Sequence, residues 1–349
     1  MGNTGPKSTV PRTASGGGEA GLRSTGAGTD QRRVRVAVDA LGGDRAPEEI
    51  VAGAAEAASP RIEPVLYGPS GLDAMGLSLV EAGEAIEMDE SPVEAVRGKL
   101  GSSLVRAVRA VADGEADAVV SAGSTGAMLA ASLLHVRRLP RVFRPAIAVV
   151  IPARRGPSVL IDAGANADAR PEHLLQFGHM GAVFAEEVLG VADPEVRLLS
   201  IGEEDEKGNQ LTLDAHELLR ASSLHFAGNT ESRLLLAGDA DVVIADGFTG
   251  NIALKALEGT IHSVLESLRE ELGSSLRGKL AGALIRPGAQ RVRQRLDSET
   301  YGGAYLLGLR GLVVIAHGSS SRKAIANAIR LAARGVEHRI VERLEERLS

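Results

Sequence analysis

The 349-residue sequence contains no cysteine and no tryptophan, and aromatic residues make up only 2% of it. The absence of cysteine excludes disulfides, thiolate metal ligands and a cysteine acyl-enzyme, and it favours a reducing cytoplasmic location. So few aromatic rings leave almost no stacking surface for single-stranded nucleic acid. A formal net charge of −6 adds no attraction for a polyanion, so we expect no nucleic-acid partner.

Long apolar runs are also missing from the sequence. No uninterrupted stretch reaches the roughly 18 apolar residues that a membrane-spanning helix requires. The N-terminal residues lack the apolar segment of a secretion signal. We therefore expect a cytoplasmic protein whose membrane contacts are peripheral.

The chain divides into a short tail and one large domain. Residues 1–31 are rich in Gly, Ser and Thr without any period, which predicts a disordered tail. In residues 32–349, β-branched runs alternate with Ala- and Leu-rich stretches of helical period, which predicts a single α/β/α domain with a mostly parallel sheet. We expect a helical protrusion at about 260–300. The expected strands are 34–40, 63–68, 85–88, 117–123, 146–152, 158–164, 196–202, 223–228, 241–247 and 311–318.

One sequence that is expected to form a strand and the turn after it occurs twice in the chain. Residues 114–126 read "GEADAVVSAGSTG" and residues 238–250 read "GDADVVIADGFTG", with seven of thirteen positions identical. Thr125 and Thr249 stand where helix N-caps are expected, and the flanking glycines let the backbone approach a ligand. A helix N-terminus can bind phosphate or an oxyanion. The two turns are therefore predicted to face one crevice, although ordinary strand-to-helix capping accounts for either copy alone.

Six ordered blocks resemble the PlsX family of phosphate acyltransferases. They are "VAVDALGGDRAPEEIVAGA", "SAGSTGAMLAAS", "DAGANADARPEHLLQFGHMGAVFAEEV", "LLSIGEEDEKGN", "ADGFTGNIALKALEG" and "YGGAYLLGLRGLVVIAHGSS". The resemblance runs from about Arg33 to Leu344. Three positions depart from the family pattern: Ser124 and Gly302 stand where Asn is common, and Arg45 stands where His is common.

The resemblance implies an activity and an architecture. Enzymes of this family move a fatty acyl group from acyl carrier protein to inorganic phosphate, which yields acyl phosphate for phospholipid synthesis. The implied fold is a three-layer α/β/α sandwich related to phosphotransacetylases and isopropylmalate dehydrogenases, and the implied assembly is a homodimer. Two alternatives stay open: a phosphotransacetylase-like enzyme that uses acyl-coenzyme A, and a non-catalytic scaffold that binds phosphate or lipid.

Substrate-binding residues are expected in the loops that follow the strands, because ligands of open α/β sheets bind outside the carboxyl ends of strands. Backbone N–H groups of these loops can hold phosphate and the thioester oxyanion. Asp39 and Asp44 would repel phosphate, so we expect them to orient a lysine or the loop backbone. The expected substrate-binding residues are Asp39, Gly42, Gly43, Asp44, Gly123, Ser124, Thr125, Gly126, Asn166, Gly247, Thr249 and Gly250.

Four side chains are candidates for the catalytic chemistry. Asn251 and Lys255 are spaced i, i+4 on the helix after "GFTG", although a solvated stripe with Glu258, His262 and Arg269 explains the same spacing. Lys207 lies in a polar loop and is a candidate phosphate ligand, unless it pairs with a neighbouring glutamate. His317 ends the last long strand, where an imidazole can give a proton to the departing thiolate or serve only the structure.

No cofactor and no metal are expected. No G-x-G-x-x-G follows a strand, and the P-loop-like string at 273–280 lacks the Ser or Thr after Lys279. The remaining histidines are scattered without ligand spacing.

Residues 272–296 form a basic stretch without acidic residues. Leu276, Leu280, Ala283 and Leu284 fall at helical spacing before Pro287, which is expected to break the run. An apolar face beside cations is typical of a helix on anionic lipid, whereas a helix pair buried in a dimer interface needs only the apolar face. The cations are Arg277, Lys279, Arg286, Arg291, Arg293 and Arg295.

Overall fold

A computed structural model describes residues 32–296 and 301–348, and from Arg33 onward the described residues form one compact unit. The expected tail, residues 1–31, lies outside them. The unit is built on an eleven-stranded sheet in the order β3-β2-β1-β4-β11-β10-β5-β6-β9-β7-β8. The strands are β1 (Val34–Asp39), β2 (Ile62–Gly68), β3 (Ser78–Glu81), β4 (Ala118–Ser121), β5 (Ala146–Ile151), β6 (Ser158–Ile161), β7 (Val196–Ser200), β8 (Phe226–Glu231), β9 (Val242–Ile244), β10 (Ala304–Leu307) and β11 (Leu312–Ile315).

Strand direction changes in the middle of the sheet. Strands β3, β2, β1, β4 and β11 are parallel to one another, and so are β6, β9, β7 and β8. Between the two groups, the pairs β11–β10, β10–β5 and β5–β6 are antiparallel. Three reversals leave the two groups running in opposite directions. We call the edge with the carboxyl ends of β1, β4 and β11 the first edge, and the edge with those of β6, β7 and β9 the second edge.

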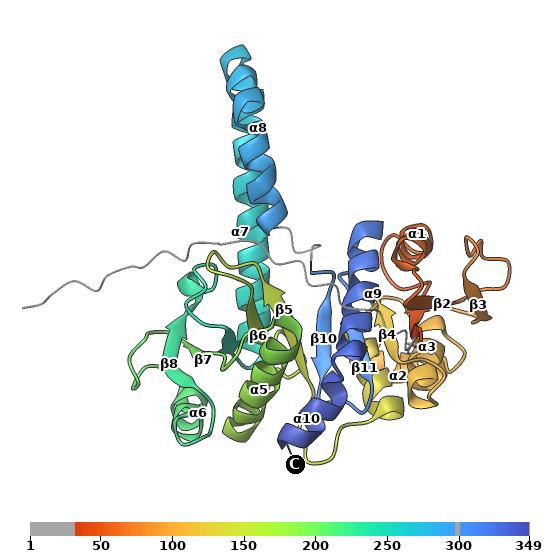
Figure 1. Cartoon of the computed structure of the whole chain (residues 1–349), viewed down its shortest axis with the longest axis horizontal. Coiled ribbons are helices and arrows are strands. Elements are labelled where there is room, and N and C mark those ends of the chain that lie inside the picture. Colours follow the sequence, from red (N-terminus) through yellow and green to blue (C-terminus); the bar gives the residue numbers. More distant parts are fainter. Residues whose placement is uncertain (1–31, 297–300, 349) are drawn as a thin grey trace, which may run out of the picture. The chain divides into compact units, whose positions relative to one another are not determined.

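Helices cover both faces of the sheet (Figure 1). One buried cluster joins the sheet to α1, α5, α6, α9 and α10, and the other joins it to α2, α3 and α4, with α7 packed at its margin. The expectation of a three-layer sandwich with a mostly parallel sheet is therefore confirmed. The helices are α1 (Glu48–Ala57), α2 (Pro92–Gly98), α3 (Ser103–Ala112), α4 (Thr125–Ala131), α5 (Pro171–Phe184), α6 (Gln210–Arg220), α7 (Gly247–Gly273), α8 (Leu276–Leu296), α9 (Arg322–Glu337) and α10 (Ile340–Leu348), with shorter turns at η1 (Ser132–Val136), η2 (Ala185–Leu189) and η3 (Ser232–Leu234).

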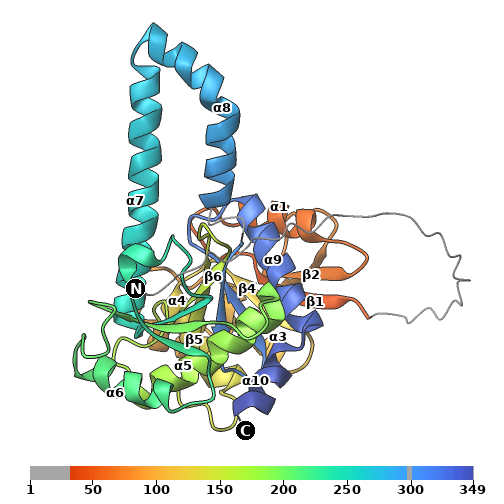
Figure 2. The ribbon, with the colours of Figure 1, turned by 60° about the vertical axis from the view of Figure 1, so that its left-hand side comes forward.

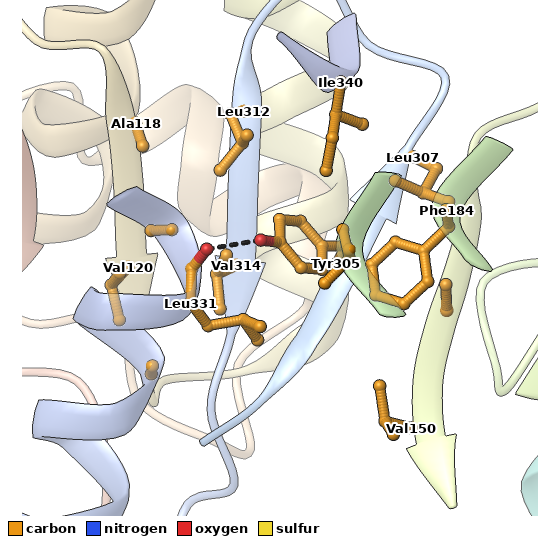
Figure 3. Packing of buried hydrophobic residues seen from close by; sticks show 14 of the residues in the cluster. Ala118, Val120, Val150, Phe184, Tyr305, Leu307, Leu312, Val314, Leu331 and Ile340 are labelled. Atoms are coloured by element: carbon orange, nitrogen blue, oxygen red, sulfur yellow. Dashed lines mark hydrogen bonds between the residues drawn. The ribbon is translucent and has the colours of Figure 1, made fainter. Parts of the chain in front are cut away.

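The centre of the sheet shows how a core with few aromatic residues is packed. Tyr305 on β10 lies edge-on to Phe184, with ring centroids 5.0 Å apart (Figure 3). Its hydroxyl donates a hydrogen bond to the Leu331 carbonyl oxygen of α9. Burial raises the pKa of the Tyr305 hydroxyl. The remaining neighbours are Val, Leu, Ile and Ala, so dense aliphatic packing holds the layers together.

Two short strands were missed and one expected strand is wrong. The residues expected as a strand at 85–88 are irregular, and β3 at Ser78–Glu81 takes the place beside β2. Strand β10 at Ala304–Leu307 was not expected, and β8 begins three residues later than predicted. Both missed strands have only four residues, a length at which pairing partners matter more than the local pattern.

Helices α7 and α8 form a hairpin that extends away from the sheet (Figure 2). Pro287 does not break α8, which continues to Leu296. The proline removes one backbone N–H, and Gly288 and Arg291 beyond it remain helical. Because this part of α8 is largely exposed, water can satisfy the freed carbonyl group.

Candidate active site

The loops at the first edge are organised around Asp39, a fully buried carboxylate at the end of β1. Its Oδ2 accepts a hydrogen bond from Ser121 Oγ at 2.7 Å, and its Oδ1 accepts one from the Leu41 N–H at 3.3 Å. Ser121 Oγ in turn accepts from the Gly123 N–H at 3.0 Å. A side chain on Gly42 would collide with Asp39, which explains the glycine. Asp39 therefore holds the backbone at Leu41 directly and that at Gly123 through Ser121.

A third loop joins this cluster. The Asp44 N–H donates to the Gly318 carbonyl oxygen at 2.8 Å, and Gly43 has a φ of 110° that favours glycine. The exposed His317 precedes Gly318, and its Nδ1 lies 2.9 Å from Ser319 Oγ. The structure thus brings the "GGD" loop, the "GSTG" turn and His317 together at the first edge.

The cap of α4 differs from the prediction. Ser124, not Thr125, is the N-cap, and its Oγ accepts from the Ala127 N–H at 3.4 Å. Thr125 is the first helical residue, and its side chain is exposed. A Cβ on Gly126 would lie 2.8 Å from Pro92 Cγ, so this glycine serves the packing of α4 against α2.

The second edge is organised by Asp162, a buried carboxylate that the sequence reasoning did not single out as a site residue. Its Oδ1 accepts from the N–H groups of Ile147, Gly164 and Ala165 at 2.9, 3.2 and 3.0 Å. Its Oδ2 accepts from both the N–H and the side-chain Nδ2 of Asn166 at 2.8 Å. Five hydrogen bonds make Asp162 the fixed centre of this loop. Its position, directly after a buried strand and before Gly, was the signal available in the sequence.

Helix α7 starts on top of this loop. The Gly247 N–H donates to the Asn166 carbonyl oxygen at 2.8 Å, and a side chain on Gly250 would collide with the Asp162 carbonyl group. The N-cap is Asp246, whose Oδ1 accepts from the N–H groups of Phe248 and Thr249 at 3.1 and 3.0 Å. The expected cap Thr249 is instead an exposed helical residue, because the carboxylate of Asp246, three residues earlier, caps the helix first.

Burial shifts the pKa values of Asp39 and Asp162, the two acids at strand ends, in the same direction. Loss of hydration raises the pKa of Asp39 and of Asp162, and the hydrogen bonds that each accepts oppose this effect. Neither carboxylate is exposed to bind a ligand. Both residues therefore act by holding loops in place.

A polar row on α7 connects the two edges. Asn251 packs beside Gly164 at the second edge, and Lys255 and Glu258 follow at one-turn spacing. Burial raises the pKa of Glu258, while the nearby His317 and Lys255 oppose the rise. The charge of His317, which follows β11 at the first edge, thus reaches Glu258. The alternative of a solvated stripe through Glu258, His262 and Arg269 fits the helix further along, where the exposed His262 lies 3.5 Å from Glu266.

Lys207 lies in the loop after β7, at the second edge. Its side chain is exposed, and its carbonyl oxygen accepts from Ser200 Oγ at 2.8 Å. Within the described chain, no ion pair joins Lys207 to the glutamates around it, and no hydrogen bond joins it to Lys255 or His317. The structure therefore does not bring Lys207 into contact with the other catalytic candidates.

The two repeated turns do not face one crevice at a shared edge, so that prediction is wrong. Strand β4 ends at the first edge and β9 ends at the second, with β11, β10, β5 and β6 between them. At about 4.8 Å per strand, the turns are separated by roughly 24 Å across the sheet. Only α7, which begins at the second edge and reaches His317, joins them.

Two further observations concern the described residues alone. No group of three or more His, Asp or Glu side chains among residues 32–296 and 301–348 is arranged to hold a metal ion. Over the same ranges, no helix combines the length and apolar composition needed to cross a membrane.

This sheet, with its central reversal and two loop edges, is the fold of phosphotransacylases. A branched-chain phosphotransacylase from Enterococcus faecalis V583 has a TM-score of 0.57 and 18% identity, covering 87% of this chain and 99% of that one. The phosphotransacetylase EutD from Staphylococcus aureus has a TM-score of 0.56 and 18% identity, covering 88% and 95%. At these identities the likeness shows the fold.

Sequence comparison identifies the family. The model of the fatty acid synthesis protein family matches residues 34–343. A phosphate acyltransferase from Heliobacterium modesticaldum is 46% identical over 90% of this chain and 98% of its own length, and one from Geobacillus thermodenitrificans is 45% identical over 90% and 99%. The chain belongs to this family, the phosphate acyltransferases, as its motifs predicted.

Proposed function

We propose that this protein transfers a fatty acyl group from acyl carrier protein to inorganic phosphate, with the reaction held between α7 and the first-edge loops. The observation that supports this site most directly is that Glu258 interacts electrostatically with both Lys255 and His317, and that His317 adjoins the glycine-rich loop held by Asp39. It combines a cation, a proton-transfer group and glycine-rich loop backbone in one region. Family membership supplies the reaction class.

The chemistry follows from the charges of the substrates. A phosphate oxygen attacks the thioester carbonyl carbon, the carbon–sulfur bond breaks, and the proton of hydrogen phosphate ends on the departing thiol. In this proposal the Lys255 ammonium holds phosphate, and Asn251 extends the polar row beside it. Positioning the two substrates about 3 to 3.5 Å apart is the main contribution the protein makes.

Charge develops on two atoms during this step. Backbone N–H groups of the "GGD" and "GSTG" loops are the proposed donors to the thioester oxyanion, since the loops are held rigid by Asp39 and Ser121. His317 is the proposed relay that passes the phosphate proton to the thiolate. Glu258 is the proposed positioning residue for Lys255 and His317.

One experiment separates this proposal from its alternatives. Purified protein is incubated with phosphate and either palmitoyl-acyl carrier protein or palmitoyl-coenzyme A, and acyl phosphate is trapped with hydroxylamine. Product with the carrier-protein substrate is expected. Product with the coenzyme A thioester alone would favour the phosphotransacetylase-like reading that the fold suggests. No product with either substrate would favour a binding scaffold.

The catalytic part is proposed to be the unit that begins at Arg33. Deletion of residues 1–30 should leave kcat and KM unchanged, as measured by the same trapping assay. Loss of soluble, active protein would show that this segment belongs to the fold.

The α7–α8 hairpin is proposed to contact anionic membrane. Leu276, Leu280 and Leu284 on α8 are 86%, 67% and 76% exposed, and the sequence of α8 contains no acidic residue. Exposed cations accompany this apolar face, and each adds about 1 kcal/mol of attraction near an anionic surface. The side chains of Arg293 and Arg295 lie outside the described set, and the remaining cations are Arg277, Lys279, Arg286 and Arg291.

Vesicle flotation tests this contact. Wild type should float with vesicles of anionic phospholipid, and the double variant Leu280→Glu with Leu284→Glu should not. The matched control is Met75→Glu with Leu100→Glu, two exposed apolar residues elsewhere in the chain, which should float like wild type. Equal flotation of the hairpin variant and wild type would exclude this contact.

A homodimer is also proposed, supported by exposed apolar side chains at the foot of α7. Phe248 and Ile252 are 62% and 51% exposed and lie one turn apart. Light scattering should give twice the chain mass for wild type, and Phe248→Asp should lower it. A monomeric wild type would contradict the proposal.

A further inference from the structure

Five exposed arginines lie on neighbouring segments at the second edge, without carboxylate partners. Within the described chain, none of the five forms an ion pair, whereas arginines elsewhere do so, as Arg322 does with Glu49 at 2.6 Å. What sets this group apart is that its five arginines lie close together on neighbouring segments, in a protein whose formal net charge is −6. The five are Arg137, Arg141, Arg144, Arg170 and Arg310, and we call them the arginine surface.

The backbone of this surface is held in place by specific contacts. The Arg310 N–H donates to the Arg137 carbonyl oxygen at 3.0 Å, which ties the β10–β11 turn to the loop before β5. Gln176 on α5 donates to the Arg141 carbonyl oxygen at 2.8 Å and accepts from the Phe143 N–H at 2.9 Å. The loop that carries Arg137, Arg141 and Arg144 is therefore preorganised, which lowers the entropic cost of binding a partner. The Arg310 Nε also donates to the Arg138 carbonyl oxygen at 3.2 Å.

The positive charge of the arginine surface affects the neighbouring His173. His173, at the start of α5, lies 6.0 Å from Phe143 between ring centroids. Burial lowers the pKa of His173, and the charges of Arg144 and Arg170 lower it further, while Glu172 opposes them. The arginines thus act together on one region, and their charge is not cancelled there.

The surface adjoins the residues that start α7. Pro145, the residue after Arg144, accepts a hydrogen bond at its carbonyl oxygen from Asn166 Nδ2 at 2.8 Å. Asn166 accepts from the Gly247 N–H, the first residue of α7. From this point the polar row of Asn251 and Lys255 leads toward His317. A donor bound on the arginine surface thus lies at the start of the path to the proposed reaction site.

We propose that the arginine surface is the docking site for an acidic protein, the carrier that delivers the acyl thioester. This inference rests on the proposed function, because it names the surface where that reaction's donor binds. Free guanidinium groups form bidentate hydrogen bonds with the carboxylates of an acidic helix. Phosphate alone is too small to engage guanidinium groups on three segments, so an extended acidic surface is the better fit. Opposite charges on the two proteins also accelerate their encounter.

The test is the double charge reversal Arg141→Glu with Arg144→Glu, matched by Arg61→Glu with Arg97→Glu. The matched pair changes the net charge equally on exposed arginines of the other half of the sheet. With palmitoyl-acyl carrier protein as donor, the first variant should show KM for the donor raised about tenfold with kcat retained. The matched variant should keep the KM of wild type. Added salt should raise the KM of wild type for the carrier-protein substrate, and the difference in this KM between wild type and the surface variant should become smaller.

Further measurements distinguish how the inference could fail. KM for phosphate, and the rate with palmitoyl-pantetheine, which lacks the carrier protein, should stay at wild-type values in the surface variant. If the surface variant lost as much activity with palmitoyl-pantetheine as with the carrier-protein substrate, the arginines would belong to the reaction site and the docking proposal would be overturned. An unchanged KM for the carrier-protein substrate would also overturn it. Loss of vesicle flotation in the surface variant, with KM unchanged, would reassign the surface to membrane. A wild type without activity on any donor would instead overturn the proposed function.

Discussion

The two copies of the Gly-x-Thr-Gly turn share their letters but start their helices differently. In the first copy, Ser124 caps α4 with one weak hydrogen bond at 3.4 Å, and the helix begins at Thr125. In the second copy, Asp246 caps α7 with two shorter bonds, and the helix begins at Gly247. The aligned residue of the first copy is Ala122, which cannot cap. Two of the positions that differ between the copies, Ala122 against Asp246 and Ser124 against Phe248, exchange the capping residue, and the helix start moves by two residues.

The helices that follow the two turns also serve different purposes. After Thr125 and Gly126, α4 continues with apolar residues, among which Ala127 and Met128 are fully buried. Helix α7 instead carries the polar row that faces His317. In our proposal the first turn contributes backbone donors and the second helix contributes side chains. Identical turn sequences therefore did not imply identical roles.

The largest expected effect concerns the buried acid beneath each turn. Asp162→Ala leaves five donors without their acceptor and should lower the free energy of unfolding by about 3 kcal/mol or more, because each unsatisfied buried group costs about 1 to 3 kcal/mol. Asp39→Ala removes fewer bonds and should cost about 1 to 3 kcal/mol. Urea unfolding compares them. If Asp162→Ala is too unstable to purify, Asp162→Asn and Asp39→Asn should show the same order. A reversed order would mean that the first edge depends more on its acid.

The second expected effect is kinetic and tests the division of roles between the helices. Lys255→Ala should lower kcat about a hundredfold, because a preorganised charge is lost, and Asn251→Ala should lower it less. Melting temperatures should remain near wild type, since Lys255 is exposed. Arg269→Ala, an exposed position further along α7, is the matched control. Wild-type kcat in both Lys255→Ala and Asn251→Ala would remove the side chains of α7 from the mechanism.

The third expected effect addresses the caps directly. Asp246→Ala should cost about 1 to 2 kcal/mol of unfolding free energy, because two short hydrogen bonds are lost. Ser124→Ala should cost about 0.5 kcal/mol, given its single long bond. Denaturant midpoints of the two variants, and of Asp246→Ser, measure the difference. Equal costs would show that cap geometry does not distinguish the turns.

The smallest expected effect is a pH dependence at Glu258. Its pKa is raised above the ordinary 4.5, so the folded state binds this proton more tightly than the unfolded state does. The resulting stability is fully present below the ordinary pKa and is lost as pH rises through the raised pKa. Glu258→Gln cannot ionise, so its stability relative to wild type should increase across that interval and then level off.

Urea midpoints from about pH 4 to about pH 8 measure this difference. Glu270→Gln, an exposed carboxylate of the same helix, corrects for removing a charge from α7. A Glu258→Gln curve parallel to wild type at every pH would contradict the assigned environment.

The sequence alone was sufficient for the class of fold, the family and most of the strands. Buried strands such as β4 and β9 are continuous apolar runs followed by small or acidic residues, a pattern that can be recognised without knowledge of distant contacts. Four-residue β10 carries no such signal, because its place between β11 and β5 is decided by pairing. The glycines at 42, 247 and 250 were expected to bind substrate, and the structure shows that a Cβ at each would also collide with neighbouring protein atoms.

The local sequence could not reveal in which direction each strand runs through the sheet. A strand–turn–helix unit has the same sequence pattern whether its strand ends at the first or the second edge of the sheet. The repeat therefore led to the prediction that both turns face one crevice. Three antiparallel pairs in the middle of the sheet decide otherwise, and they place Gly123 and Gly247 at opposite edges. The approach of Glu258 to His317 is likewise a tertiary result, because the residues are 59 positions apart in sequence and meet only where α7 crosses toward the first edge. Chain-local propensities determined the elements, whereas packing between distant segments determined which of their ends meet.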